Sequence, residues 1–508
     1  MGREVYGPGI ARLAARIRPV SLRGLAKHSA VYTVGNLAPK IGAFLLLPIY
    51  VRFLSQADYG AVALLTSLAG VLGIVYHLGV DGALMRLHFD THGRQRAQLY
   101  VTLAAFTLIV STVLTLLLAV VLGPSFETLF AGTPFVPLGV LALLLAFAGS
   151  MQFIPAVLFR ASGQAGRFLA LNLGAFLISS AASVVLVAGF GFGATGVLLG
   201  QLIANVAVLG VTAIVVMRLG MVGFDTAALR SALGLGLPLL PHALSAWILR
   251  LADRWLLALL LGLPALEARA QIGVYAVGYQ LGYVVTILVT SFNAAWSPYF
   301  FRIGDRPEAP RFYAEMVTLV LAGLLVLAVG VSVLAPEIVA LVARPGYEAA
   351  ADVLPVIAFA SVLQGAYTMF VTAIFFMKRT GPLALITFGS AALNVTLNIV
   401  LIPMLGIMGA AWATMGAYAF FATATLVFAR RLYPIEIAWA PLALLAVIGV
   451  AVVVGSRALA GGPSAGALAI HLAIGLGFAG LGWVICRGPI DRLRTLARRL
   501  AAEGNAFG

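Results

Sequence analysis

Charged residues are scarce in this chain. Asp, Glu, Lys and Arg make up only 10% of its 508 residues, whereas 62% of the residues are hydrophobic. Soluble domains carry about 25% charged and about 45–50% apolar residues. The composition therefore excludes a soluble globular protein. It predicts an all-α polytopic membrane protein, because a chain that crosses lipid must satisfy its backbone hydrogen bonds internally.

Cysteine and the common catalytic motifs are almost absent. Cys486 is the single cysteine, so the chain forms no internal disulfide and no cysteine-based metal site. We find no phosphate-binding loop, no Ser-His-Asp set and no metal-ligand spacing. The connections between apolar runs are short and leave no room for a soluble domain. We therefore expect neither an enzyme nor a bound metal or cofactor.

Apolar runs of spanning length occur fourteen times. About 20 residues are needed to cross the hydrocarbon core. Residues 1–28 precede the first run as a basic tail, and they lack the apolar region of a cleavable signal peptide. The predicted transmembrane helices are 29–54, 58–85, 98–122, 135–159, 168–189, 194–217, 233–261, 272–299, 313–335, 353–377, 382–402, 407–429, 439–459 and 464–486.

Acidic residues are fewer than basic ones, and the basic ones are unevenly placed. The chain has 32 Lys and Arg against 17 Asp and Glu, a net charge of +15. In the fourteen-helix arrangement, 25 of these 32 basic residues fall on one side. Such a bias follows the positive-inside rule, so it predicts both termini in the cytoplasm. It also accounts for the basic net charge without a nucleic-acid partner.

A weak internal repeat divides the chain into two halves. Gly60-Ala-Val-Ala is matched by Gly273-Val-Tyr-Ala, and Gly193-Ala-Thr-Gly by Gly406-Ile-Met-Gly, both at an offset of 213. Pro39-Lys40 similarly precedes Arg52 by the same spacing that separates Pro241-His242 from Arg254. Parallel repeats of this kind are typical of transporters. The predicted parts are an N-lobe at 29–217, a cytoplasmic linker at 218–232, a C-lobe at 233–430, two extra helices within 431–486 and a basic tail at 487–508.

The stretch from Gly234 to Gly262 combines spanning length with buried charge. Pro238 and Pro241 interrupt it, and Arg250, Asp253 and Arg254 follow. Each isolated charge in a membrane helix costs about 3 kcal/mol on insertion scales, so such residues face a partner, water or a ligand. Arg250 and Arg254 are four residues apart and share a helix face. The pattern predicts a bent helix that presents guanidinium groups to an anion pathway.

Two more basic residues complete the candidate set of cavity cations. Lys40 lies beside Pro39, and Arg52 ends the same run. The alternative for Lys40 is a structural contact with a carbonyl freed by the proline, or with Asp253. Arg254 likewise has an alternative, either pairing with Asp253 or extending toward the interface.

Three titratable residues are candidates for coupling or for structural roles. Asp253 lies between the two arginines, which favours its ionised form and a structural role over proton transfer. His242 has an ordinary pKa near neutrality, about 6.5, but follows a helix break. Asp81 lies near the inner end of the second run. We expect none of them to bind a metal.

Several segments resemble Wzx-type polysaccharide flippases of the multidrug/oligosaccharidyl-lipid/polysaccharide exporter superfamily. They are LLLPIYVRFLSQADYG at 45–60, LGVDGALMRLHFD at 78–90, ADRWLLALLLG at 252–262, IGVYAVGYQLG at 272–282 and LIPMLGIMGAAWAT at 401–414. The resemblance implies a V-shaped, two-lobed bundle in the bacterial inner membrane. It also implies alternating-access transfer of undecaprenyl-pyrophosphate-linked oligosaccharide to the periplasmic leaflet, for O-antigen, capsule or exopolysaccharide.

The implied partners are the lipid-linked oligosaccharide, membrane lipids and polysaccharide polymerase or export proteins. Three alternatives stay open: an ion-coupled multidrug exporter, a lipid II flippase and a membrane enzyme of polysaccharide assembly. Intramembrane amides are candidates for contact with sugar hydroxyls, or else for hydrogen bonds between helices. These amides are Asn36, Asn172, Gln201, Asn205, Gln280, Asn293, Gln364, Asn394 and Asn398.

Overall fold

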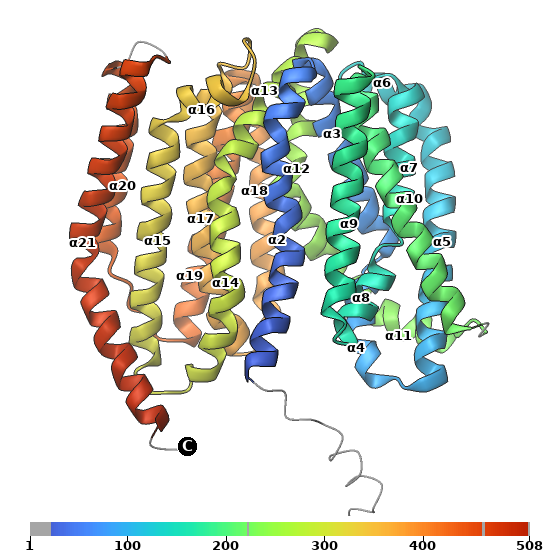
Figure 1. Cartoon of the computed structure of the whole chain (residues 1–508), viewed down its shortest axis with the longest axis horizontal. Coiled ribbons are helices and arrows are strands. Elements are labelled where there is room, and N and C mark those ends of the chain that lie inside the picture. The colour runs from blue at the N-terminus through green and yellow to red at the C-terminus, as the bar shows by residue number, and fades with distance from the viewer. Residues whose placement is uncertain (1–21, 221–222, 460–462, 506–508) are drawn as a thin grey trace, which may run out of the picture.

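The chain folds into two helical bundles side by side, with a further helix pair against one of them (Figure 1). This computed structural model describes residues 22–220, 223–459 and 463–505. It describes the side chains of these residues except those of 22–34, 36–37, 40 and 497–505. Throughout the described part every regular element is helical, as the composition predicts.

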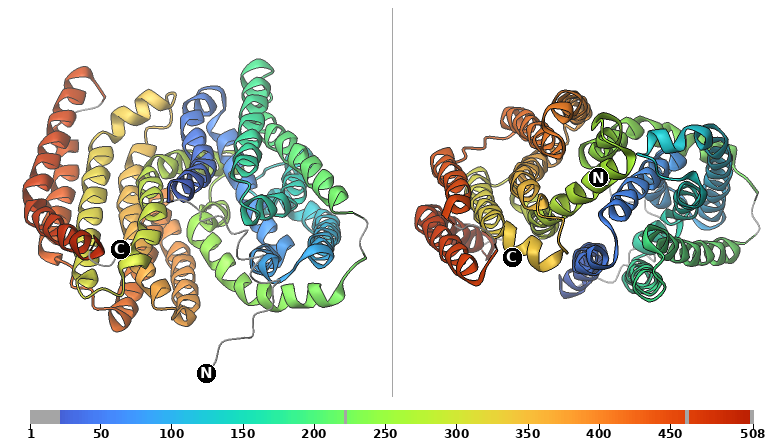
Figure 2. Two further views of the ribbon diagram at one scale, coloured as in Figure 1. Left: turned by 60° about the horizontal axis from the view of Figure 1, so that its bottom comes forward. Right: turned by 90° about the horizontal axis from the view of Figure 1, so that it is seen from above.

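The first bundle, the N-lobe, contains the helices up to the loop at 220. Their bounds are α2 Leu22–Phe53, α3 Gln56–His77, α4 Val80–Asp90, α5 Gly93–Leu122, α6 Phe126–Leu129, α7 Val140–Gly149, α8 Phe153–Ala161, α9 Ala165–Val184 and α10 Gly193–Leu219. Helix α2 packs on α9 and also contacts α14 and α16 of the second bundle. It therefore lies between the two lobes (Figure 2).

The second bundle, the C-lobe, follows a short connecting helix, α11 Thr226–Gly236. Figure 1 places α11 at the same face as α4. The remaining helices are α12 Leu240–Leu260, α13 Ala265–Gly282, α14 Val284–Ile303, α15 Ala309–Val333, α16 Ala335–Val342, α17 Ala350–Phe376, α18 Gly381–Leu405 and α19 Ile407–Leu432, then the extra pair α20 Trp439–Leu459 and α21 Ala465–Asn505.

The helices confirm the predicted membrane architecture. Thirteen helical segments of the described residues are long and apolar enough to cross a membrane. Helix α2, of 32 residues, covers the first of the fourteen predicted spans and is not among these thirteen; its described apolar part is Ile41–Phe53. Leu22 begins and Asn505 ends the described chain on the same face of the molecule (Figure 1). An even number of crossings accounts for that arrangement.

Several predicted helices are interrupted rather than continuous. The break expected at Pro238 and Pro241 is confirmed, since a short 3-10 turn at Leu237–Leu239 separates α11 from α12. The second predicted helix ends early, because Leu78 and Gly79 adopt left-handed conformations between α3 and α4. Tyr283 likewise divides the eighth helix into α13 and α14. The predicted tail at 487–508 continues α21 as far as Asn505.

Glycines allow the lobes to touch at two levels. A Cβ added at Gly60 of α3 would lie 1.9 Å from the Arg269 carbonyl oxygen, and one at Gly273 of α13 would lie 2.1 Å from that of Gln56. At the opposite face, a Cβ at Gly79 would lie 2.1 Å from the Gly236 carbonyl oxygen. Only glycine permits backbones to approach this closely.

The internal repeat has structural counterparts. Gly60 and Gly273, equivalent at the offset of 213, contact each other's helices across the boundary between the lobes. Gly193, the first residue of α10, and Gly406, the residue before α19, both have positive φ, at 52° and 57°. Equivalent residues thus perform equivalent tasks in the two halves, and the lobes meet where the repeats correspond.

Polar contacts fasten the extra helices α20 and α21 to the C-lobe. The Arg457 guanidinium forms an ion pair with Asp352, and its Nη2 donates to the Ala351 carbonyl oxygen over 2.7 Å. The buried His471 contacts Glu337 through Nδ1 at 2.7 Å. Toward the chain end, the Arg492 Nε lies 2.5 Å from a carboxylate oxygen of Glu315. These contacts join the pair to α15, α16 and α17.

Candidate functional site

A cavity of about 420 Å³ lies between the two lobes. Residues of α2, α3 and α10 line it on the N-lobe side, and residues of α12 and α13 on the C-lobe side. The elements that carry the charged stretch and the repeat glycines therefore surround one space. We call it the central cavity.

Arg254 contributes the positive charge on the wall of the central cavity. Its side chain is 7% exposed, and its Nη1 lies 2.6 Å from Oδ1 of Asp253, which is 2% exposed. The same Nη1 donates to the Arg250 carbonyl oxygen over 2.9 Å, one turn earlier in α12. Nε and Nη2 make no hydrogen bond within the described part of the chain. These donors are available to a ligand.

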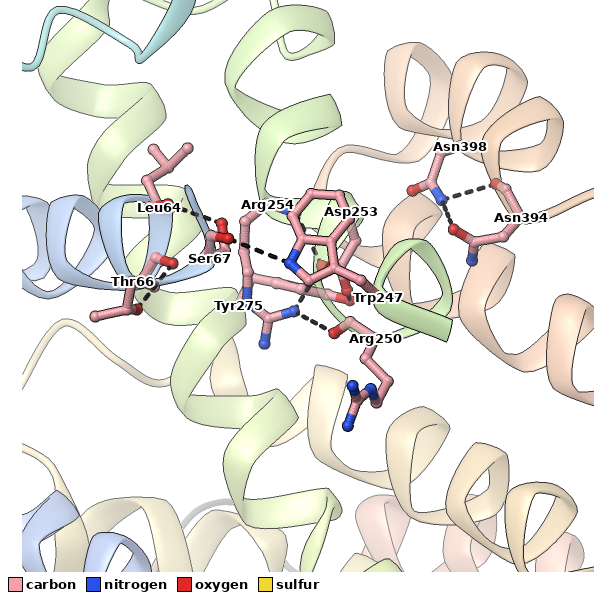
Figure 3. A network of polar contacts seen from close by, with 11 residues as sticks. Leu64, Thr66, Ser67, Trp247, Arg250, Asp253, Arg254, Tyr275, Asn394 and Asn398 are labelled. Carbon is pink, nitrogen blue, oxygen red and sulfur yellow. Dashed lines mark hydrogen bonds and ion pairs between the residues drawn. The ribbon is translucent and has the colours of Figure 1, made fainter. Parts of the chain in front are cut away.

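Two tyrosines of α13 contact the ion pair, and Figure 3 shows one of them, Tyr275. The Tyr275 hydroxyl donates to Oδ2 of Asp253. The Arg254 guanidinium carbon lies 4.3 Å from the centre of the Tyr279 ring, a cation–π contact. Both carboxylate oxygens of Asp253 are thus occupied, whereas the guanidinium keeps open donors. The arrangement is suited to presenting the Arg254 guanidinium to an anionic ligand, because both oxygens of the Asp253 carboxylate already have partners.

Arg250 lies one turn from Arg254 and is more accessible. Its side chain is exposed, and its Nε donates to the Ala246 carbonyl oxygen over 3.2 Å. Figure 3 shows its guanidinium directed away from the Asp253 carboxylate. Tyr283, which lies between α13 and α14 and lines the central cavity, interacts through its hydroxyl with the Arg250 side chain. Arg250 therefore stands beside the cavity without an acidic partner among the described residues.

Three other predicted site residues, Arg52, His242 and Asp81, lie apart from this cluster. Arg52 is exposed at the end of α2, where its Nη2 donates to the Leu341 carbonyl oxygen of α16 over 3.3 Å. His242 is exposed in the first turn of α12, and Asp81 is exposed in the first turn of α4. Lys40 belongs to α2, but its side chain lies outside the described part of the structure. None of these four is a described lining residue of the central cavity.

Side chains that the sequence reasoning missed connect the lobes around the cavity. The Tyr59 hydroxyl donates to Oε1 of Gln280 over 3.0 Å, and Nε2 of Gln280 donates to the Ala43 carbonyl oxygen over 3.1 Å. Nε1 of Trp247 donates to the Ser67 carbonyl oxygen over 3.2 Å. Of the two roles predicted for Gln280, contact with sugar or a bond between helices, the structure shows the second. Tyr275 and Tyr279 belong to the segment IGVYAVGYQLG that resembles the flippase family, but the sequence assigned them no role, and no motif marks Trp247.

The C-lobe interior holds further polar groups on α18, near α12 (Figure 3). Nδ2 of the buried Asn398 donates to the carbonyl oxygen of Asn394 over 2.8 Å. Nδ2 of Asn394, Oδ1 of Asn398 and the hydroxyls of Thr414 and Tyr418 are buried without a hydrogen-bond partner among the described residues. Buried polar atoms of this kind are usually satisfied by water. No cluster of three or more metal-ligating side chains occurs in the described part of the chain.

Comparison with known proteins identifies the family. A sequence model described as "Polysaccharide biosynthesis protein" matches residues 25–304, more than half of the chain. The chain belongs to this polysaccharide biosynthesis protein family. The match covers the N-lobe, the connecting helix, the site on α12 and α13, and the first helices of the C-lobe. The predicted kinship with polysaccharide flippases is thereby confirmed, while the Wzx type stays a prediction. No curated protein matches the chain.

Solved structures share the fold. The lipid II flippase MurJ, in an inward closed conformation, aligns with a TM-score of 0.66 at 15% identity over 89% of this chain and 99% of its own. An inward-facing MATE-family multidrug transporter gives 0.57 at 18% identity over 78% and 94%. A mutant of the Vibrio cholerae MATE transporter VcmN gives 0.53 at 16% identity over 80% and 97%. These TM-scores establish the common fold of a multi-pass membrane protein.

Proposed function

We propose that this protein is a flippase for a lipid-linked oligosaccharide that carries a pyrophosphate. The single observation that supports it most is Arg254, a buried guanidinium with open donors on the wall of a cavity between two lobes. A pyrophosphate headgroup loses its hydration on entering hydrocarbon, at a cost of many kcal/mol for an unpaired charge. Arg254 and the neighbouring Arg250 replace part of that hydration.

The charge of the cavity favours an anionic cargo over a cationic drug. Arg254 is the charged residue among the described lining side chains, and Asp253 behind it is already paired. An exporter of cations needs an accessible carboxylate in its binding site. The fold alone accommodates both activities, since flippase and multidrug transporter structures align with this chain. Lipid II remains an alternative cargo, because it too carries a pyrophosphate.

Transfer requires the lobes to expose the cavity to each side in turn. The close backbone contacts at Gly60 and Gly273 near one face, and at Gly79 and Gly236 near the other, are the contacts that such a motion breaks alternately. We place the face that carries the start of α2 and the end of α21 in the cytoplasm of a bacterial inner membrane, following the bias of basic residues. Polysaccharide polymerase and export proteins are the proposed partners, and no chemical step is assigned to the chain.

Deletion of the gene in its own host tests the proposal. Loss of a flippase leaves lipid-linked repeat units on the cytoplasmic leaflet, where an external glycosidase cannot reach them until the cells are opened. A drug exporter would instead give drug sensitivity with normal glycan, and an assembly enzyme would abolish sugar transfer in isolated membranes. Either of the latter results would replace the proposed function.

A further inference from the structure

The N-lobe contains a second cavity, of about 520 Å³. It lies between α3, α7, α9 and α10, and Gln201 of α10 lines both this space and the central cavity. Its size falls within the range of about 300–1,000 Å³ that is usual for small-molecule sites. The two cavities are therefore neighbours on either side of Gln201.

Neutral hydrogen-bonding groups line this N-lobe cavity. Nδ2 of Asn172 donates to the Phe168 carbonyl oxygen over 2.9 Å, and Nδ2 of Asn205 donates to that of Leu145 over 3.2 Å. Each of these amides keeps its own oxygen as an acceptor. Three more lining side chains make no hydrogen bond within the described part of the chain: Gln152, Ser179 and Gln201. The cavity thus offers donors and acceptors together.

The rest of the lining gives this cavity space and an apolar surface. Small residues such as Ala69, Gly73 and Ala175 keep it open, and the ring of Phe176 forms part of the wall. No Asp, Glu, Lys or Arg occurs among the described lining side chains. His77 is the titratable one, and its Nε2 is already 2.8 Å from the Ser150 carbonyl oxygen. Hydroxyl-rich neutral ligands match such a lining, whereas a carboxylate would lose its hydration without a compensating charge.

We infer that the N-lobe cavity binds uncharged sugar units of the headgroup while Arg254 holds the pyrophosphate. This inference rests on the proposed flippase function and adds the class of sugar that the protein accepts. Amides satisfy sugar hydroxyls because each amide both donates and accepts, and an aromatic ring covers the apolar face of a pyranose. Gln201 lines both subsites.

Gly73 provides a substitution that fills the cavity without straining the backbone. It lies inside α3, and a Cβ added there meets no atom within 4 Å. Gly73→Leu therefore places a side chain in the sugar site. Gly210 is the matched control, since it lies inside α10, is exposed, and also has no atom within 4 Å of an added Cβ. Gly210→Leu leaves the cavity unchanged.

The test measures transport by the full chain in proteoliposomes with three fluorescent probes. They are undecaprenyl pyrophosphate with one neutral hexose, with a neutral tetrasaccharide, and with a tetrasaccharide that contains a uronic acid. Gly73→Leu is expected to slow the neutral tetrasaccharide by about tenfold, because two or three lost hydrogen bonds change affinity by about that factor. We expect Gly73→Leu to transport the single-hexose probe at close to the wild-type rate, and Gly210→Leu to transport the probes at close to the wild-type rates. We expect the wild type to transport the neutral tetrasaccharide faster than the acidic one.

Equal losses for the short and long neutral probes, or none, would overturn the sugar site. So would equal transport of the acidic and neutral tetrasaccharides by the wild type. If the wild-type protein moves none of the three probes, it is the proposed function that fails. If the Gly73→Leu protein is absent from the membrane, Gly73→Val is tested in its place, because it occupies less of the same space. The same ratio of transport rates, for the long and the short neutral probe, is then measured.

Discussion

Asp253 and Arg254 divide their tasks within one buried pair. The carboxylate is occupied by Arg254 and by the Tyr275 hydroxyl, so it anchors the guanidinium. The guanidinium uses Nη1 for the anchor, and we propose that Nε and Nη2, which make no hydrogen bond within the described part of the chain, bind the ligand. A residue that only stabilised the fold would have no need of free donors facing a cavity. This distinction can be tested by separating stability from transport.

Arg254→Ala leaves the Asp253 carboxylate buried without its partner. Breaking a buried pair in this way costs about 3–5 kcal/mol, so we expect low membrane abundance and a lower melting temperature. The double variant Asp253→Asn/Arg254→Gln removes both charges and is expected to recover abundance but not transport. Thermal unfolding in detergent and a flipping assay measure the two effects. Recovery of transport together with abundance would assign Arg254 a purely structural role.

Arg250→Ala is expected to behave differently, because Arg250 is exposed and has no acidic partner among the described residues. We expect near-normal abundance with transport reduced about tenfold, and partial rescue by Arg250→Lys, which keeps the charge but loses the planar fork. Lys40→Ala is expected to act in the same direction. Normal transport in both alanine variants would refute a cationic cavity. Quantitative immunoblotting beside the flipping assay provides the control.

The sequence identified the charged residues but not their surroundings. Arg254 and Asp253 were found because charge is costly in a spanning helix, whatever the fold. Tyr275 and Tyr279 were missed, because tyrosines are ordinary in membrane helices and these two approach the pair only when α13 folds back on α12. Arg52 was expected in the cavity, and the structure instead places it on the Leu341 carbonyl oxygen. Its partner is 289 residues away in the chain, beyond any local pattern.

At the scale of elements, α3 and α13 form the contact that closes the lobes near one face. Gly60 and Gly273 allow carbonyl oxygens to approach within 2.1 Å of where a Cβ would stand. Any larger residue must push the helices apart, because backbone cannot yield as a flexible side chain does. Gln280 and Tyr59 join across the same interface. We therefore assign this contact to the closed state of the outer gate.

Gly60→Leu and Gly273→Leu are each expected to open this gate. The readout is labelling of Gln280→Cys by a membrane-impermeant maleimide added outside, in a protein whose native Cys486 is replaced by Ser. Labelling of Gln280→Cys should rise several-fold over that in a control protein that carries Gly210→Leu instead of the gate substitution. The added side chain of this control is exposed. Unchanged labelling in both gate variants would show that the α3–α13 contact does not control access.

Element boundaries were predictable where a local signal existed. Pro238 and Pro241 predicted the break before α12, and the structure shows it. The break at Tyr283 follows the single Gly282 within a long apolar run, which was too weak a local signal to predict it. The turn at Gly79 is explained only by the close approach of Gly236, a tertiary contact.

At the scale of the whole molecule, the membrane potential is the proposed driving force. Asp253 is saturated by its partners, and His242 and Asp81 do not line the central cavity, so the described cavity has no evident proton carrier. A potential is worth about 2.3 kcal/mol per charge per 100 mV, which favours outward movement of an anion. In proteoliposomes, an imposed potential should speed transport and a pH gradient alone should not. If transport instead depends on the pH gradient alone, and this dependence is lost in Asp253→Asn, then Asp253 is the proton site.

The central claim is that this chain by itself carries a pyrophosphate-linked oligosaccharide across a bilayer through the cavity at Arg254. The most direct measurement reconstitutes the purified protein with a fluorescent undecaprenyl-pyrophosphate oligosaccharide and follows its exposure to a quencher outside the vesicles. We predict that the wild type equilibrates the probe between leaflets within minutes, and that the folded Asp253→Asn/Arg254→Gln protein leaves it at the rate of protein-free vesicles. Equal rates for the wild type and the protein-free vesicles would contradict the account.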